Sequence, residues 1–170
     1  MCVSSEPILS CSAMINVLEF WSPSADVHLR MSLDPRRLAV MGSPMPFIHH
    51  LGVFASDFER SERFYTVTLK SLGIAAGYRA DGVAEYWHPD QDTPSMSLER
   101  ADQSATATKG MHLAFAAGSR AAVDAFHAAA VAAGGATKHA PRFWSEYRAY
   151  CAFVSDPDGN NIEAVHKEIQ

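Results

Sequence analysis

Apolar and polar positions along residues 46–167 predict two groups of elements that follow the same order. Short apolar runs bounded by turn residues indicate strands, and apolar residues three or four positions apart indicate helices that bury one side. Each group consists of a strand, a helix and three further strands. The predicted strands cover residues 47–55, 74–79, 83–88, 95–100, 111–117, 136–139, 148–154 and 161–166.

Capping residues mark the ends of the two predicted helices. The first helix begins after Asp57 and ends at Gly73, and the second begins after Ser119 and ends at Gly134. Asp and Ser side chains accept hydrogen bonds from the free N–H groups of a first helical turn, and Gly readily adopts the conformation that stops a helix. In the second helix Phe126 lies on the predicted buried stripe.

The two groups are copies of one unit at a constant offset of 62 residues, because His50–Asp57 is matched by His112–Ser119, and Phe64 by Phe126, without a gap. A fixed period indicates two copies of one supersecondary unit. We therefore predict an α+β fold made of two βαβββ modules, residues 46–102 and 110–167. The turn Asp156–Asn160 precedes the last strand, and its aspartates are expected to serve only as turn residues.

Residues 1–45 share none of this pattern and are predicted to be an N-terminal extension with little fixed structure. The chain has 170 residues, of which 48% are hydrophobic, and this suits one compact domain over residues 46–167. No apolar run approaches the roughly 20 residues that span a bilayer. A net charge of −5 without a basic stripe argues against nucleic-acid binding.

Cysteine usage gives an expectation about the compartment. The three cysteines are Cys2, Cys11 and Cys151, and their spacing fits neither a zinc site nor a disulfide framework. They are interpreted as reduced thiols, as in a cytoplasmic protein.

The repeat also places chemistry-bearing residues at matching positions. His50 and His112 lie at equivalent positions of the first strand in each unit, and Glu163 lies in the last strand. One period before Glu163 the sequence comes within two residues of Glu99, which we expect to be its counterpart. Two imidazoles with one or two carboxylates suit a borderline divalent metal ion and leave positions open for substrate. The alternative for Glu99 is an exposed carboxylate paired with Arg100.

Three segments carry a resemblance to a known family. Ile48–Val53, Gly110–Phe115 and Asp156–Glu163 resemble the glyoxalase, bleomycin-resistance and extradiol-dioxygenase superfamily, also called the vicinal oxygen chelates. The resemblance covers about residues 46–167. It implies that the two modules form a cupped, barrel-like mixed sheet around a divalent metal ion such as Zn, Ni, Fe or Mn.

The resemblance assigns roles to the same residues. His50, His112 and Glu163 match the usual metal triad of the family, and Glu99 matches the fourth ligand of its glyoxalase I-type members. Glu163 or Glu99 would also act as the catalytic carboxylate. Relatives of this length often form homodimers, so the modules can pair within one chain or across two copies. The sequence leaves both arrangements open.

A segment before the penultimate strand, Arg142–Tyr150, mixes aromatic and charged residues, and in relatives this region lines the cup. Here Trp144 and Tyr147 would stack on a small-molecule substrate, and Arg148 or Tyr150 would bind an oxyanion. The alternative is a loop that aromatic packing holds in place.

Three functions follow from these residues. The first is a metal-dependent lyase or isomerase whose ion binds adjacent substrate oxygens and stabilises an enediolate while a carboxylate shuttles a proton. The second is an extradiol-type iron(II) dioxygenase, with His139, Tyr147 or Tyr150 as its acid–base partner. The third is a protein that sequesters a small toxic molecule without catalysis.

Overall fold

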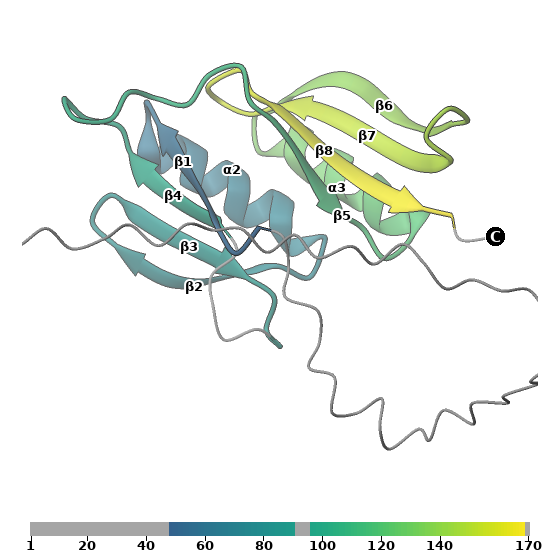
Figure 1. Ribbon diagram of the computed structural model, residues 1–170, viewed down its shortest axis with the longest axis horizontal. Coiled ribbons are helices and arrows are strands. Elements are labelled where there is room, and N and C mark those ends of the chain that lie inside the picture. Colours follow the sequence, from purple (N-terminus) through teal and green to yellow (C-terminus); the bar gives the residue numbers. More distant parts are fainter. Residues whose placement is uncertain (1–47, 91–95, 169–170) are drawn as a thin grey trace, which may run out of the picture. The chain divides into compact units, whose positions relative to one another are not determined.

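The computed structural model describes residues 48–90 and 96–168. The predicted extension at residues 1–45, with Cys2 and Cys11, lies outside these ranges. The described elements are, in chain order, β1 (Leu51–Ala55), α2 (Phe58–Lys70), β2 (Ala75–Ala80), β3 (Val83–Trp87), β4 (Met96–Arg100), β5 (His112–Ala116), α3 (Arg120–Ala132), β6 (Ala136–Trp144), β7 (Ala149–Ser155) and β8 (Asn161–Lys167) (Figure 1).

Each module forms its own four-stranded sheet. The strand orders are β1-β4-β3-β2 and β5-β8-β7-β6, so the two sheets have the same topology. The first and last strands of each module pair in parallel, and all other pairs are antiparallel. The α+β fold with two βαβββ modules is confirmed, and the two sheets stay open instead of closing into one barrel.

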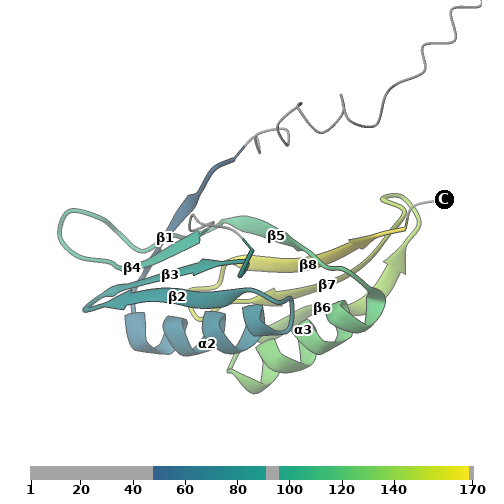
Figure 2. The same cartoon turned by 90° about the horizontal axis from the view of Figure 1, so that it is seen from below.

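Both helices cover the same side of the two sheets, as Figure 2 shows. Alternate strand residues therefore point into a core under the helices, where α2 also packs against α3. The largest buried side chains of this core are Tyr65, Tyr86, Phe64, Phe126, Leu69, Leu98 and Ile162. The remaining strand residues point to the opposite side, which is called the open face below.

The helix ends follow the predicted capping chemistry. The Asp57 carboxylate accepts a hydrogen bond from the Arg60 N–H, and the Ser119 hydroxyl oxygen accepts one from the Ala122 N–H. Gly73 has a φ of 79°, a left-handed conformation that favours glycine after a helix. No helix in the described residues is long and apolar enough to cross a membrane.

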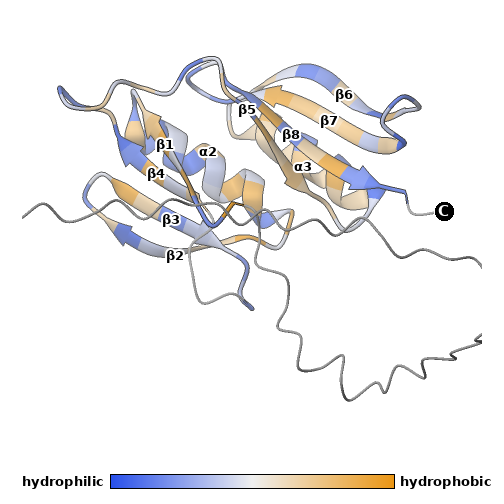
Figure 3. Ribbon diagram, viewed as in Figure 1, coloured by the Kyte–Doolittle hydropathy of each residue, from blue (hydrophilic) through white to orange (hydrophobic). Residues whose placement is uncertain are grey.

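The strand β6 is longer than the sequence predicts. The prediction ends it at His139, whereas the strand continues to Trp144 with irregular pairing between Thr137 and Arg142. Pro141 argues against a strand in the sequence, because proline has no N–H donor for a neighbouring strand. An edge strand with bulges tolerates it. In Figure 3 hydrophobic residues gather on β5 and β7, while β6 is mostly hydrophilic. A mostly exposed edge strand of this composition resembles a loop in the sequence.

Candidate metal centre

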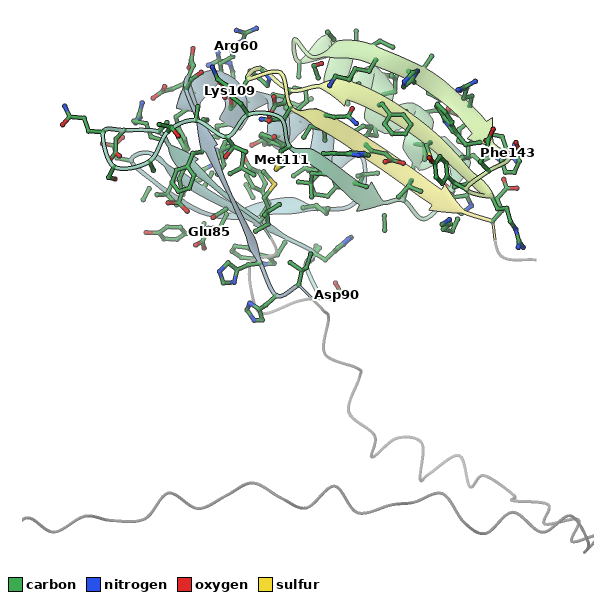
Figure 4. All side chains as sticks on the ribbon, turned by 45° about the horizontal axis from the view of Figure 1, so that its top comes forward. Arg60, Glu85, Asp90, Lys109, Met111 and Phe143 are labelled. Carbon is green, nitrogen blue, oxygen red and sulfur yellow. The ribbon has the colours of Figure 1, made fainter. Side chains whose placement is uncertain are left out.

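The second module brings a histidine and a carboxylate together on its open face. His112 begins β5 and lies two residues before Ala114, which is paired with Glu163 of β8. Side chains two residues apart on a strand share a face, so His112 and Glu163 become neighbours although they are 51 residues apart. The His112 Nε2 atom lies 2.9 Å from the Glu163 Oε2 atom. In Figure 4 the labelled Met111, directly before His112, marks this end of β5.

The chemistry of this His112–Glu163 pair suits a divalent metal ion. An imidazole nitrogen and a carboxylate oxygen each bind such ions at about 2 Å, so two donors about 3 Å apart can share one ion. The His112 side chain is 54% exposed and that of Glu163 is 12% exposed. The imidazole is therefore accessible, while Glu163 is held in place by its surroundings.

Cys151 of β7 lies beside the same carboxylate. Cys151 is buried. Its side chain lies on the open face, because its neighbours Ala152 and Tyr150 point into the core. Burial, followed by a hydrogen bond to Glu163, raises the pKa of the Cys151 thiol to about 12. The thiol therefore stays protonated at neutral pH and is a hydrogen-bond donor to Glu163.

This pKa predicts slow alkylation of Cys151 in the folded, metal-free protein. At pH 8 a thiol with a pKa of about 12 is ionised in only about one molecule in ten thousand, and the thiolate is the reactive form. We expect iodoacetamide to leave the Cys151 peptide unmodified in a mass-spectrometric map at pH 8. The same peptide should be labelled after unfolding in urea, where the thiol regains a pKa near 8.5. Rapid labelling of the folded protein would contradict the assigned environment.

The first module presents His50 separately. His50 is exposed just before β1, and its Nδ1 atom lies 3.0 Å from Nδ1 of His49. Within residues 48–90 and 96–168 of one chain, no three His, Cys, Asp or Glu side chains meet as a metal site requires. One copy of the chain thus joins His112 with Glu163 but does not add His50 to them.

The register shows that Glu99 is not the positional counterpart of Glu163. Gly52 of β1 corresponds to Ala114 of β5 at the offset of the repeat, and it is paired with Ser97. Ser97 therefore occupies the place that Glu163 has in the second module, and the prediction based on counting is wrong by two residues. The error arises because the segments between the first and last strands differ in length.

Glu99 nevertheless lies on the open face, two residues beyond Ser97. Its Oε1 atom accepts a hydrogen bond from the Ser97 hydroxyl at 3.0 Å. A Cβ atom on Gly52 would stand 3.7 Å from that same oxygen, so the carboxylate reaches back over Gly52. The alternative expectation, an ion pair between Glu99 and Arg100, is wrong, because Arg100 pairs with Glu59 and Asp81 instead.

An aromatic patch, consisting of His139, Trp144 and Phe153, continues from the His112–Glu163 pair across the open face. Phe153 is paired with Glu163 in the sheet, and its ring centroid lies 6.0 Å from that of His112. The Trp144 and His139 rings stand edge-on to Phe153 at 5.5 and 5.4 Å. The sequence does not predict a role for Phe153. It lies two residues after Cys151 on β7, so both side chains lie on the open face.

The other residues predicted to bind substrate have different surroundings. Tyr147 is exposed in the turn after β6, with its ring 6.4 Å from that of Trp144. Arg148 lies in the same turn with a φ of 49°. Tyr150 turns toward the helix side, where its hydroxyl donates to Asp124 of α3 at 3.0 Å. Of the residues predicted to bind substrate, Trp144 and Tyr147 lie near the site, whereas Tyr150 lies away from it.

The turn before β8 does more than reverse the chain. Asp156 is buried, and its carboxylate accepts hydrogen bonds from the Tyr65 hydroxyl and from both nitrogens of Asn160. Burial, followed by the Asp156 charge, raises the pKa of the Tyr65 hydroxyl above its usual range. The Asn160 side-chain oxygen in turn accepts from the Met111 N–H. This network ties α2 to the ends of β5 and β8, which carry His112 and Glu163.

Comparison with known proteins identifies the family. The protein-family model described as "Glyoxalase/Bleomycin resistance protein/Dioxygenase superfamily" matches residues 47–164, well over half of the chain. The chain therefore belongs to this superfamily. No curated protein matches the sequence.

Solved structures agree with this assignment. A glyoxalase/bleomycin resistance protein from Albidiferax ferrireducens T118 is 34% identical, with a TM-score of 0.62, and the alignment covers 72% of this chain and 100% of that one. A glyoxalase-related enzyme from Fulvimarina pelagi is 20% identical, with a TM-score of 0.56 and coverages of 71% and 87%. A lactoylglutathione lyase from Agrobacterium tumefaciens is 21% identical, with a TM-score of 0.51 and coverages of 73% and 96%. The last two similarities show the fold alone.

Proposed function

We propose that this protein is a metal-dependent lyase or isomerase that acts on a small substrate with adjacent oxygen atoms. The observation that carries the proposal is the His112–Glu163 pair, with donor atoms 2.9 Å apart on an open sheet face. Membership of the superfamily and the equivalent position of His50 in the repeat support it.

The centre is proposed to form between two copies of the chain. Both sheets have their helices on the same side (Figure 2), so within residues 48–90 and 96–168 of one copy neither helix covers an open face. A second copy in the opposite orientation can place its first module over the second module of its partner. His50, with Glu99 nearby, would then complete the ligand set begun by His112 and Glu163. Such a homodimer would hold two equivalent centres, as a twofold interface requires.

In this proposal the side chains have distinct tasks. A bound divalent ion would supply Lewis acidity toward the adjacent oxygens of the substrate. His112 and His50 would hold that ion as neutral imidazoles. Glu163 would take a proton from a substrate carbon and return it, because it combines partial burial with access to the open face. Glu99, oriented by Ser97, would be the second carboxylate at the centre.

One observation favours an extradiol-type iron(II) dioxygenase as the second candidate. His139 lies in the aromatic patch, edge-on to Phe153, which contacts the His112 ring. An imidazole next to two histidine ligands and one carboxylate would serve as the acid–base partner in that reaction. Tyr150 is not available for this task because it faces α3.

Metal analysis joined to a substrate screen tests the proposal. Protein purified without added metal is assayed for Ni, Zn, Fe and Mn, and is then tested with dicarbonyl–thiol adducts and with catechols. We expect stoichiometric Ni or Zn with isomerisation or lysis of the adducts. Iron with catechol cleavage would replace the lyase by the dioxygenase. A protein that takes up none of these ions would contradict both and leave non-enzymatic binding.

A further inference from the structure

We infer that the substrate carries a planar, ring-like group next to its chelating oxygens and an anionic group beyond that ring, which Arg142 binds. The inference rests on the proposed function for the position of the chelating oxygens, and it adds the substrate class. It assigns Arg142 as the residue that determines specificity for charge.

The aromatic patch gives the ring its place. It begins at Phe153, directly beside the His112–Glu163 pair, and ends at Trp144 near the end of β6, where Figure 4 labels the adjacent Phe143. The Phe153 and Trp144 rings are edge-on to each other with centroids 5.5 Å apart. Aromatic side chains arranged in this way offer both an edge and a face to a further ring. A flat substrate bound at the His112–Glu163 pair therefore extends over Phe153 toward Trp144.

Arg142 adds a positive charge at the far end of this patch. Its guanidinium carbon lies 3.6 Å from the centre of the Trp144 ring, so the planar group is stacked on the indole. Stacking fixes the orientation of a guanidinium and leaves its N–H donors free for a carboxylate or phosphate. In the parts of the chain that the structure describes, Arg142 forms no ion pair, unlike Arg79, Arg100 and Arg120. The exposed Arg142 is thus oriented but has no acidic partner.

The surroundings of Arg142 add to this positive charge. Trp144 is paired with Ala149, and Ala149 with Lys167, whose ammonium group donates to the Tyr147 carbonyl oxygen at 2.5 Å. The open face therefore carries the Glu163 carboxylate at one end and two cations at the other. Neighbouring strands are about 4.8 Å apart, and residues along a strand about 3.4 Å. The Cα atoms of Glu163 and Arg142 are accordingly separated by roughly 12 Å, which the two side chains and a single-ring substrate can span.

Binding of three matched probes to the metal-loaded full chain tests the inference. Protocatechuate has adjacent hydroxyls, a ring and a carboxylate, and its amide differs only in lacking the charge. Benzoate keeps the ring and the carboxylate without the adjacent oxygens. Affinities are measured by calorimetry for the wild type and for Arg142→Gln, with Arg63→Gln on the exposed side of α2 as the control that removes an equal charge.

We expect the wild type and Arg63→Gln to bind protocatechuate about tenfold or more tightly than its amide, as a charge-assisted hydrogen bond provides. Arg142→Gln should abolish this difference by weakening the binding of protocatechuate and not that of its amide. Trp144→Ala should weaken both compounds. Trp144→Phe should retain binding, since the indole N–H has no partner in the described residues.

Equal affinities for acid and amide in the wild type, or a preference that persists in Arg142→Gln, would overturn the inference. Failure of the proposed metal centre gives a different result. The chain would then take up no metal, and protocatechuate would lose its advantage over benzoate. Benzoate binding that weakens in Arg142→Gln would still support the role of Arg142, and benzoate binding unaffected by that substitution would overturn it.

Discussion

Replacing His112 by alanine is expected to lower the affinity for divalent metal by more than about 100-fold while the fold is retained. Loss of residues that merely orient metal ligands already costs 10–100-fold, and removal of a ligand costs more. The His112 side chain is 54% exposed, so its truncation opens no cavity in the core. Metal content by mass spectrometry and a thermal unfolding curve measure the two effects separately.

A matched control separates ligand loss from a general effect of losing a histidine. His127 of α3 bonds Thr137 on the helix side of the module, with its Nε2 atom 2.9 Å from the threonine oxygen. His127→Ala should leave metal affinity unchanged. Glu163→Gln, which keeps the shape of the side chain but removes its charge, should act like His112→Ala. Full metal occupancy in His112→Ala would contradict the assignment of this residue.

Replacing Asp156 by alanine is expected to destabilise the domain by about 3–5 kcal/mol. Its carboxylate accepts hydrogen bonds from Tyr65, from Asn160 and from the Asp158 N–H, and it is only 5% exposed. Alanine would leave buried donors without partners, which costs more than the loss of an exposed hydrogen bond. Because Tyr65 belongs to α2, the substitution also removes a link between the modules.

The same turn supplies the control. Asp158 bonds the backbone and side chain of Ser56 at the surface, so Asp158→Ala should cost only about 1 kcal/mol. Urea unfolding followed by circular dichroism gives the free energy of unfolding for each variant. Similar losses for the two substitutions would contradict the assignment of Asp156 as a buried hub.

The order of elements could be predicted because local signals and the repeat agree. Caps at Asp57 and Ser119, the glycines that end the helices and the apolar runs each specify a local conformation. The extension of β6 to Trp144 could not be predicted, because Pro141 and polar residues on an edge strand resemble a loop. Edge strands need only one neighbour, which the sequence of the strand itself does not reveal.

Only part of the candidate site could be predicted, because some of its residues depend on register and packing and not on local sequence. His112 and Glu163 follow from strand alternation once their strands are recognised. The position of Glu99 depends on register, and register depends on loop length, so counting along the repeat failed by two residues. The buried role of Asp156 was missed because an Asp-Pro-Asp-Gly turn is explained locally without any partner from α2. Long-range partners are set by packing and have no signature near Asp156.

The most direct test of the shared metal centre is complementation between two inactive variants. His50→Ala and His112→Ala chains with different tags are co-expressed, and the mixed dimer is purified and analysed for metal. We expect no bound metal in either variant alone and one ion per mixed dimer, since one centre regains both histidines. A mixed dimer of His112→Ala with Glu163→Gln, whose changes lie in the same half of the centre, should remain empty. Metal retained by the His50→Ala protein alone, or none in the mixed dimer, would show that the two copies do not share the metal centre in this way.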